Sequence, residues 1–433
     1  MKAVFYITFP MMLISFIQPL IIFIDNIFLS TIGDTQLAAV GIVTPVINLI
    51  NAFSVGLGSA GIALIGNCIG REDREKSEFL SRQLISLSML ISLIGSIIVF
   101  VFGEFAIGGV TGKLLENTRT YLYITALGIP LVFLNSSYVS IKRANGASLV
   151  PLVITIMALV FKSIFNYIAI NLLGLEIAGA AYATITTNLV IVIIDYYDLF
   201  RKKYCGEISL KNFKLDKIAM INMSKIGLPS ALSSAANHFS FILMNGQALS
   251  YGEEVLTAYG IANTLNSMFF NPITAVGGAM STIVSQNVGA GKIDRAKEAY
   301  RKTTKISFAI SIVLAIILVP LSGVMVRFFT DTEIVLYHAT NAMQIYSIAI
   351  IGWSVFQTQQ GVFIGTGKTK ITLYSTIIRV WILRVLFVYI CDIVAPQMNE
   401  YTIWYSMLVS NVGILAYTFY EIKKLDWKFD VDI

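Results

Sequence analysis

The stretch LAAVGIVTPVINLINAFSVGLGSAGIALIGNCIGREDREK, residues 37–76, decides the fold class of this chain. A long run of apolar and small residues ends in a short charged loop, after which apolar sequence resumes. A helix needs about 20 consecutive apolar residues to cross a lipid bilayer. The stretch therefore predicts a membrane span whose last turn reaches a polar interface.

The same pattern returns in the second half of the chain, as LTAYGIANTLNSMFFNPITAVGGAMSTIVSQNVGAGKIDRAK, residues 256–297. Three positions align at one constant offset: Gly41 with Gly260, Asn67 with Gln286 and Gly70 with Gly289. A weaker match joins KSIFNYIA, which begins at Lys162, to RVLFVYIC, which begins at Arg384. Repeats of six spans each share one orientation, so an axis along the membrane normal should relate them.

The composition also indicates a membrane protein. Of the 433 residues, 56% are hydrophobic and only 13% are charged, whereas soluble domains carry about 25% charged residues. Lipid must therefore contact much of the surface. Twelve apolar stretches predict twelve transmembrane helices, over residues 4–29, 43–69, 83–105, 119–141, 151–172, 178–200, 222–250, 258–287, 304–328, 337–362, 371–395 and 401–421. The fold class expected is all-α integral membrane, with two pseudo-symmetric six-helix bundles.

A polar, basic segment divides the chain close to its middle. It reads RKKYCGEISLKNFKLDKIAM from Arg201 onward, and we expect a cytoplasmic linker over residues 201–221. The first six-helix bundle then covers residues 1–200. The second covers residues 222–433 and ends in a short cytoplasmic tail.

The distribution of positive charge predicts the orientation, because cytoplasmic loops are enriched in Lys and Arg. With the N-terminus inside, 24 of the 31 Lys and Arg residues fall on the inner side and only Lys113, Arg119 and Arg327 on the outer side. We therefore expect a multi-pass protein of the cell's inner membrane with both termini in the cytoplasm. The first span lacks a small-residue cleavage site, so we interpret it as a mature helix rather than a signal peptide.

Asp25 is the most informative single residue. It lies about two-thirds of the way along the first span, after Pro10 and Pro19. A charge at membrane depth is costly and usually faces a cavity, and burial favours the neutral form of a carboxylic acid. Asp25 is therefore a candidate for binding a coupling proton or sodium ion, and Pro19 can supply a kink for a binding-dependent bend. The alternative is a residue near the outer interface, capped by Asn26 or by water.

Lys162 and Asn166 lie one turn apart in the fifth span and share a helix face. Lys162 is deep in apolar sequence, about eleven residues from Pro151. The structural alternative is a lysine that extends its ammonium group toward the inner surface. That reach is poor from mid-span, which favours a functional role.

Polar side chains in the second half are candidates for a substrate cavity. With Asn26 of the first span, we assign this role to Asn237, His238 and Gln357. Such groups can also hold helices together through hydrogen bonds, and a lone histidine is often a hydrogen-bonded fixture. Arg384 is expected to anchor its helix near the outer interface.

Several classes of protein are poorly supported. The chain contains no Walker A motif, no HExxH and no GxSxG, so neither direct ATP hydrolysis nor enzyme chemistry is expected. Three widely separated cysteines predict neither disulfides nor a metal site. We expect no cofactor beyond a coupling ion, no nucleic-acid partner, and a monomer in the lipid bilayer that binds a small organic substrate.

The motifs resemble those of the multidrug and toxic compound extrusion (MATE) family over the whole chain. The first span, reaching IDNIFLSTIGDTQLAAVG, is similar to the family's proline-led helix with its aspartate. The loops GNCIGREDREK and SQNVGAGKIDRAK resemble its paired loop motifs, and LGLEIAGAAYAT resembles its GAAxAT turn. The opening of the seventh span, KIGLPSAL, is also similar.

The resemblance implies a V-shaped pair of six-helix bundles that exports organic compounds in exchange for protons or sodium ions. The family's first-helix aspartate falls on Asp25. An Asn–Asp pair and a threonine, found in one branch, fall on Lys162, Asn166 and Thr184, so an amine stands where an amide is expected and an amide where a carboxylate is expected. Carboxylates of another branch fall on Asn237 and Trp353.

These departures lead to a specific hypothesis for coupling. Lys162 takes the place of a bound cation by pairing with Asp25, and protonation of Asp25 breaks the pair. Sodium coupling is then less favoured, since a nearby ammonium group repels Na⁺. Few acids line the expected cavity, so neutral or zwitterionic substrates fit better than cations.

Three alternatives stay open at this point. A lipid-linked oligosaccharide flippase of the same superfamily would need a cationic cavity, for which the sequence offers Lys162, Arg379 and Arg384. A degenerate, non-transporting member would explain the scarcity of carboxylates. A membrane-embedded enzyme would need clustered acids or histidines at one face, which the short outer loops do not offer.

Overall fold

The computed structural model describes residues 2–201 and 214–429. Within these ranges the chain is helical and contains no strand. Most of the expected linker, residues 201–221, lies outside the described residues. The helix that follows it, α7, already begins at Lys217, inside the range expected for the linker.

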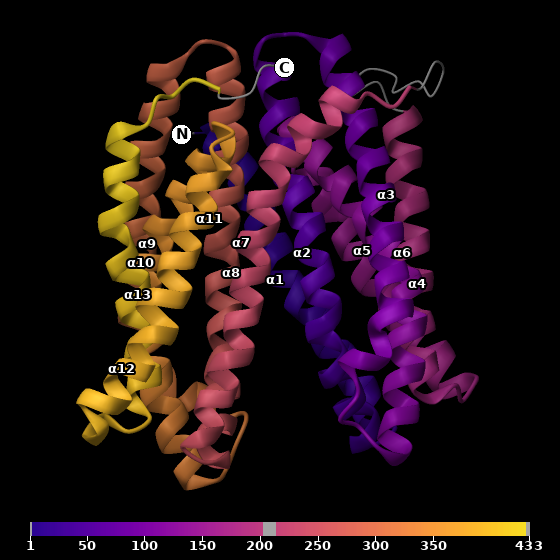
Figure 1. Ribbon diagram of the computed structural model, residues 1–433, viewed down its shortest axis with the longest axis vertical. Helices are drawn as coiled ribbons and strands as arrows, with labels where there is room; N and C mark the ends of the chain where they lie inside the picture. Colours follow the sequence, from indigo (N-terminus) through magenta and orange to yellow (C-terminus); the bar gives the residue numbers. More distant parts are fainter. Residues whose placement is uncertain (1, 202–213, 430–433) are drawn as a thin grey trace.

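The described residues form twelve helical spans, six in each half of the chain (Figure 1). The first half contains α1 (Lys2–Ser30), α2 (Asp34–Gly70), α3 (Arg74–Ala106), α4 (Gly112–Ala144), α5 (Leu149–Asn166) continued by the π-helix η1 (Tyr167–Leu172), and α6 (Glu176–Arg201). The second half contains α7 (Lys217–Ser250), α8 (Glu253–Gly289), α9 (Ile293–Arg327), α10 (Glu333–Gly365), α11 (Thr369–Ile377) with η2 (Ile378–Leu386) and α12 (Phe387–Val394), the short η3 (Pro396–Met398), and α13 (Tyr401–Lys424).

Eight of the helices in the described ranges, α1 to α6 with α9 and α10, are long and apolar enough to cross a membrane by length and composition. The α7 and α8 helices fall short because polar residues are interspersed along them, as in NHFSFILMNGQALS of α7. The eleventh span is divided between α11, η2 and α12. The all-α membrane fold predicted from the sequence is confirmed.

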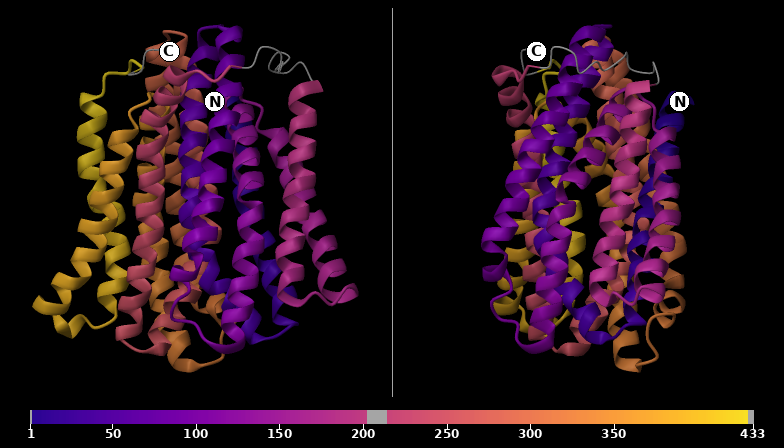
Figure 2. Two further views of the ribbon diagram at one scale, coloured as in Figure 1. Left: turned by 45° about the vertical axis from the view of Figure 1, so that its right-hand side comes forward. Right: turned by 90° about the vertical axis from the view of Figure 1, so that its right-hand side faces the viewer.

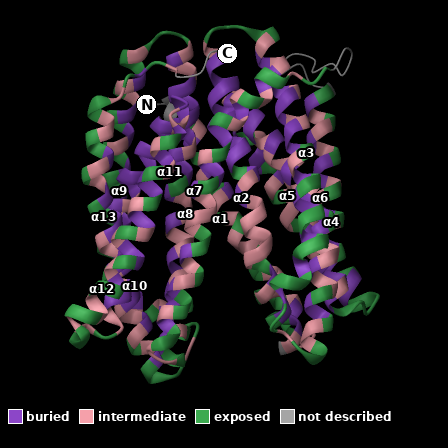
Figure 3. Cartoon of the chain, viewed as in Figure 1, coloured by how far each residue is buried: buried purple, intermediate pink, exposed green. Residues whose placement is uncertain are grey.

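The two halves meet at the end of the molecule that carries both termini, and their helices diverge toward the other end (Figures 1 and 2). Helix α1 packs against α8 of the other half as well as against α5 of its own, and α2 packs against α7 and α8. Buried residues gather where the halves meet (Figure 3). Each half therefore sends its first two helices to the central interface.

Glycines allow the closest approach between the halves. A Cβ atom on Gly70 would lie 2.0 Å from the backbone oxygen of Gln286, and one on Gly289 would lie 2.1 Å from the backbone oxygen of Asn67. Gly70 aligns with Gly289 and Asn67 with Gln286 in the sequence repeat, so the two contacts are reciprocal. Reciprocal contacts are the signature of a two-fold interface, which confirms the pseudo-symmetry.

The same end is also held by hydrogen bonds that join distant segments. Gln286 Nε2 donates to the backbone oxygen of Ala144 at 2.7 Å, which joins α8 to the end of α4. Gln83 of α3 donates to the backbone oxygen of Lys214 at 2.7 Å and accepts from the backbone nitrogen of Asp216 at 3.1 Å. The start of the second half is thus fixed to the first.

Each half contains a π-helical segment in or beside the span that carries one of the aligned cations, Lys162 or Arg384. In the first half η1 begins five residues after Lys162, and in the second half η2 contains Arg384. The weaker sequence repeat aligns Lys162 with Arg384, so η1 and η2 lie close to this aligned pair but do not occupy equivalent residues. Since π-helical turns are rare and frequently occur at functional sites, they direct attention to these two spans.

Candidate functional site

A buried ion pair lies in the first half, between α1 and α5. Lys162 Nζ is 3.1 Å from Asp25 Oδ1, and Asn166 Nδ2 donates to the same oxygen at 2.6 Å. Lys162 is 3% exposed, whereas the Asp25 side chain is 24% exposed. The cation is thus enclosed and the carboxylate keeps a path to its surroundings.

Helix α6 completes the surroundings of the ammonium group. Lys162 Nζ donates to the Thr184 hydroxyl and lies 3.4 Å from the backbone oxygen of Ala180. An ammonium group has three donors, and the carboxylate, the hydroxyl and the carbonyl account for all three. The structure therefore brings together Asp25, Lys162, Asn166 and Thr184, the four residues assigned to ion coupling; that role stays a prediction.

The arrangement has definite chemical consequences. The pair carries no net charge, and Lys162 holds the position in which a free cation would neutralise Asp25. Among the described contacts of this pair, no other carboxylate shares the position of Asp25. Lys162 does not extend toward the inner surface, so that alternative interpretation is wrong.

The residues assigned to a substrate cavity are more scattered. Asn237 lines a cavity of about 170 Å³ in the second half. Asn26 and His238 are exposed and do not line it, and Gln357 is buried elsewhere, beside Gly277. Of the four residues assigned to a substrate cavity, only Asn237 therefore lies in this cavity of the described second half, and the assignment of the four to a substrate cavity stays a prediction.

The cavity in the second half is lined by amides, aromatic rings and two arginines: Asn237, Phe241, Asn263, Asn266, Ser267, Phe270, Asn271, Trp353, Arg379, Arg384, Met407 and Asn411. We call it the arginine cavity. Arg379 and Arg384 are 2% and 3% exposed. Arg384 was expected to anchor its helix at the outer interface, and its burial shows that this expectation is wrong.

Neutral groups surround both arginines. Arg379 donates to Asn237 Oδ1 at 2.8 Å and to Asn411 Oδ1 at 3.3 Å. Arg384 donates to Ser410 Oγ at 3.1 Å and 3.2 Å, to Met407 Sδ at 3.0 Å and to Asn411 Oδ1 at 3.5 Å. Within the described ranges, neither guanidinium lies within ion-pair distance of a carboxylate.

The π-helix explains how both arginines reach one cavity. Residues five apart in an α-helix point about 140° away from each other. Because hydrogen bonds in a π-helix run from i to i+5, one turn of η2 holds more residues than an α-helical turn and brings Arg379 and Arg384 closer to the same face. Sequence reasoning with α-helical geometry does not find this pair.

A second polar cluster in the first half was also missed. Asp195 is fully buried and accepts a hydrogen bond from Asn135 at 2.8 Å. One turn later, Asp198 lies 2.5 Å from Lys142 Nζ and accepts from Tyr138 at 2.8 Å. The signal in the sequence was IDYYD near the end of the predicted span 178–200, and its two acids were not singled out.

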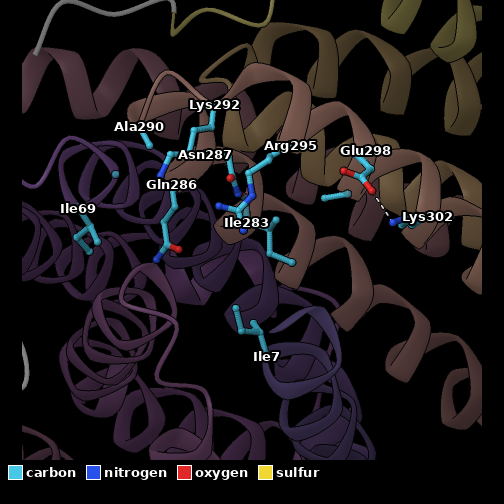
Figure 4. A pocket seen from close by; sticks show the side chains of 12 residues that line it. Ile7, Ile69, Ile283, Gln286, Asn287, Ala290, Lys292, Arg295, Glu298 and Lys302 are labelled. Atoms are coloured by element: carbon cyan, nitrogen blue, oxygen red, sulfur yellow. Dashed lines mark hydrogen bonds and ion pairs between the residues drawn. The ribbon is translucent and has the colours of Figure 1, made fainter. Parts of the chain in front are cut away.

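A further cavity, of about 450 Å³, lies where the halves meet near the termini. Figure 4 shows its polar side chains on α8, the following loop and α9, with Ile7 of α1 and Ile69 of α2 opposite. Glu298 forms an ion pair with Lys302 at its edge. This cavity belongs to the interface between the halves, away from the Asp25–Lys162 pair.

Known proteins resemble this chain along most of its length. It is 23% identical over 359 residues to the probable multidrug resistance protein YoeA of Bacillus subtilis, covering 81% of this chain and 77% of the relative. It is 23% identical to the multidrug export protein MepA of Staphylococcus aureus, covering 89% and 86%. A FAD transporter of Shewanella oneidensis is 26% identical, covering 64% and 62%.

A solved structure confirms the fold. The outward-facing conformation of a multidrug resistance MATE family transporter superposes with a TM-score of 0.90 at 23% identity, covering 98% of this chain and 95% of the other. The MatE family model matches residues 10–168 and 229–390, once in each half. The relatives are membrane transporters rather than enzymes, and their names indicate efflux. The chain belongs to the MatE family.

Proposed function

We propose that this protein exports small organic compounds across the cell's inner membrane by alternating access, driven by proton influx. The observation that carries the proposal is the ion pair between Lys162 and the partly exposed Asp25 carboxylate. The Asp25 carboxylate can take up and release a proton, and it lies on α1, which also packs against α8 of the other half.

Helix α1 gives the proton a mechanical consequence. It packs against α5, which carries Lys162 and Asn166, and against α8 of the second half. Protonation of Asp25 would remove the charge that attracts Lys162 and weaken the contact of α1 with α5. Pro10 and Pro19 interrupt the helix hydrogen bonds of α1, so the helix can bend at these points and alter its packing on α8.

Proton coupling fits the pair better than sodium coupling. A sodium ion at Asp25 would lie close to the ammonium group of Lys162, and two unit charges 4 Å apart repel by about 4 kcal/mol at an effective dielectric constant of 20. A proton, by contrast, neutralises the carboxylate and leaves the ammonium group in contact with Thr184 and the backbone of Ala180.

We further propose that both termini lie in the cytoplasm and that the protein functions as a monomer in the bilayer. The excess of Lys and Arg in loops at the end that carries the termini supports this orientation. The diverging end in Figure 1 would then face outward. This is the state in which a substrate is released and a proton enters.

A lipid-linked oligosaccharide flippase is the second candidate. One observation favours it: the two buried arginines provide positive charge in the second half, which such a protein would need for a diphosphate-linked substrate. Translocation of a fluorescent lipid-linked sugar in liposomes, with no export of aromatic compounds, would support this alternative.

The test is export into inside-out vesicles, with a pH gradient and a sodium gradient imposed separately. We expect transport with the pH gradient alone, and Asp25→Asn should abolish it while leaving the amount of folded protein unchanged. Arg119→Gln, which removes an exposed ion pair with Glu104, serves as the control. Undiminished pH-driven transport by Asp25→Asn would refute the role of Asp25.

A further inference from the structure

We propose that the arginine cavity binds the anionic group of an aromatic substrate, so that the compounds carried include aromatic acids. The inference rests on the proposed export function only in taking the cavity as a place where the carried compound binds. It concerns the second half of the chain, whereas the coupling pair lies in the first.

The arginine cavity carries positive charge that no described acid neutralises. Two guanidinium groups face it, both at least 97% buried, and every contact described for them is to an amide, a hydroxyl, a thioether or an aromatic ring. Arg379 Nε is buried without a hydrogen-bond partner. The described residues therefore leave this donor of Arg379 unsatisfied.

The first half shows what a structurally satisfied cation looks like in this fold. Lys162 aligns with Arg384 in the sequence repeat, and it is neutralised by Asp25 at 3.1 Å. No acid of the described second half takes the part of Asp25 beside Arg384. The repeat thus keeps the cation in both halves and the counter-ion in only one.

Binding of an anion would lower the energetic cost of burying the two guanidinium groups. Enclosing an ionised group costs several kcal/mol even after the protein relaxes around it, and two like charges in one cavity add repulsion. Hydrogen bonds to neutral amides offset part of this cost. A carboxylate or phosphate offsets more, because arginine binds these groups through two parallel, charge-assisted hydrogen bonds.

The remaining walls select the rest of the ligand. Trp353 and Phe270 stack with ring centroids 5.7 Å apart, and the Arg379 guanidinium carbon lies 4.8 Å from the Trp353 centroid. Phe241 and Met407 add apolar surface. A flat aromatic ring can pack against these side chains while its acidic group reaches the arginines.

The size of the cavity limits the ligand further. About 170 Å³ is below the 300–1,000 Å³ typical of sites for drug-sized molecules. We therefore expect one or two fused rings with a single acidic group.

The experiment compares three probes that share one ring system: naphthalene-2-carboxylate, naphthalene-2-carboxamide and 2-naphthylmethylammonium. Binding of each radiolabelled probe to the purified, full-length protein in neutral detergent is measured by scintillation proximity. We expect the carboxylate to bind at least 10-fold more tightly than the carboxamide, and the ammonium compound to bind most weakly. Equal affinity for carboxylate and carboxamide would overturn the proposal.

Variants locate the site. Arg379→Gln and Arg384→Gln should each weaken carboxylate binding at least 10-fold and leave carboxamide binding unchanged, while Arg379→Lys should retain part of the preference. Arg119→Gln is the matched control, since it removes an arginine that lies outside the cavity. Unchanged carboxylate binding by the double variant Arg379→Gln/Arg384→Gln would also overturn the proposal.

Two further measurements, a thermal shift and a lipid competition, complete the test. If a glutamine variant does not fold, ligand-induced stabilisation of the wild type decides: the carboxylate should raise its unfolding temperature and the carboxamide should not. Soluble dihexanoyl phosphatidylglycerol is tested as a competitor, and if it displaces the carboxylate at lower concentration than unlabelled carboxylate does, the site binds a lipid headgroup and the aromatic assignment fails.

Failure of this inference can be told apart from failure of the proposed function. Binding is measured without any ion gradient, so it can succeed even if pH-driven export does not. Conversely, a protein that binds carboxylate and carboxamide equally could still export its substrate in a way that depends on Asp25.

Discussion

At the scale of single residues, buried positive charge is treated differently in the two halves. Lys162 and Lys142 of the first half lie 3.1 Å and 2.5 Å from carboxylate oxygens. Arg379 and Arg384 of the second half contact neutral groups among the described residues. These two lysines of the first half are therefore neutralised by acids of the fold, whereas these two arginines of the second half are not.

Replacing Lys142 by methionine tests the structural role of the missed cluster. Lys142 is 1% exposed and pairs with Asp198, and removing one partner of a buried pair typically costs about 3–5 kcal/mol. We expect Lys142→Met to lower the unfolding temperature of the purified protein clearly, in a thermal scan in detergent.

The control for this change is Arg119→Gln. It breaks the exposed pair with Glu104, whose side chains are about half accessible, and exposed pairs contribute little to stability. A fall in unfolding temperature as large for Arg119→Gln as for Lys142→Met would contradict the interpretation.

At the scale of helices, the central interface depends on glycines where α2 and α8 cross. The clash expected for a side chain on Gly70 or Gly289 is with backbone oxygen atoms, which cannot rotate away. The aligned pair Gly41 and Gly260 lies in the same two helices but has open space around it. Gly41 and Gly260 thus serve as matched controls for substitutions at Gly70 and Gly289.

Alanine at these positions should separate the two cases. Gly70→Ala or Gly289→Ala should destabilise the packing seen here by about 1–3 kcal/mol, as overpacking usually does. Gly41→Ala and Gly260→Ala should be neutral or stabilising by up to about 1 kcal/mol, because glycine inside a helix is unfavourable. Thermal unfolding of the four variants decides, and equal loss in both pairs would argue against the glycine contact.

The sequence allowed much of the fold and the first site to be predicted. Hydropathy located all twelve spans, and the repeat aligned Gly70 with Gly289, whose contacts with the other half are reciprocal. Asp25, Lys162 and Asn166 were found because charged and amide groups stand out in apolar sequence. Arg379 and Arg384 were not recognised as a pair, because their spacing of five has meaning only in a π-helix, and local sequence does not reveal that winding.

At the scale of the whole molecule, two halves joined at one end should move as bodies about that junction. Related halves typically rock against each other around a central site. Spin labels at Glu72 and Lys292, both in exposed loops near the termini, report on the joined end. Labels at Thr31 and Glu253, exposed at the opposite end, report on the diverging end.

Gly70→Ala should lengthen the distance between labels at Glu72 and Lys292, because the new methyl group separates the two halves at their joined end. If the halves move as rigid bodies, the distance between labels at Thr31 and Glu253 should then shorten. Double electron–electron resonance in liposomes measures both, and Gly41→Ala should change neither. Distances that lengthen together would indicate loosening rather than rocking.

The winding of η2 has one more consequence. Its backbone carries slack, because each turn holds more residues than an α-helix would allow. If the segment tightened into an α-helix, the side chains of Arg379 and Arg384 would swing more than a third of a revolution apart. The two guanidinium groups would then no longer face one cavity. Rewinding of η2 would therefore leave fewer residues in each turn of the helix and separate the two positive charges in a single motion.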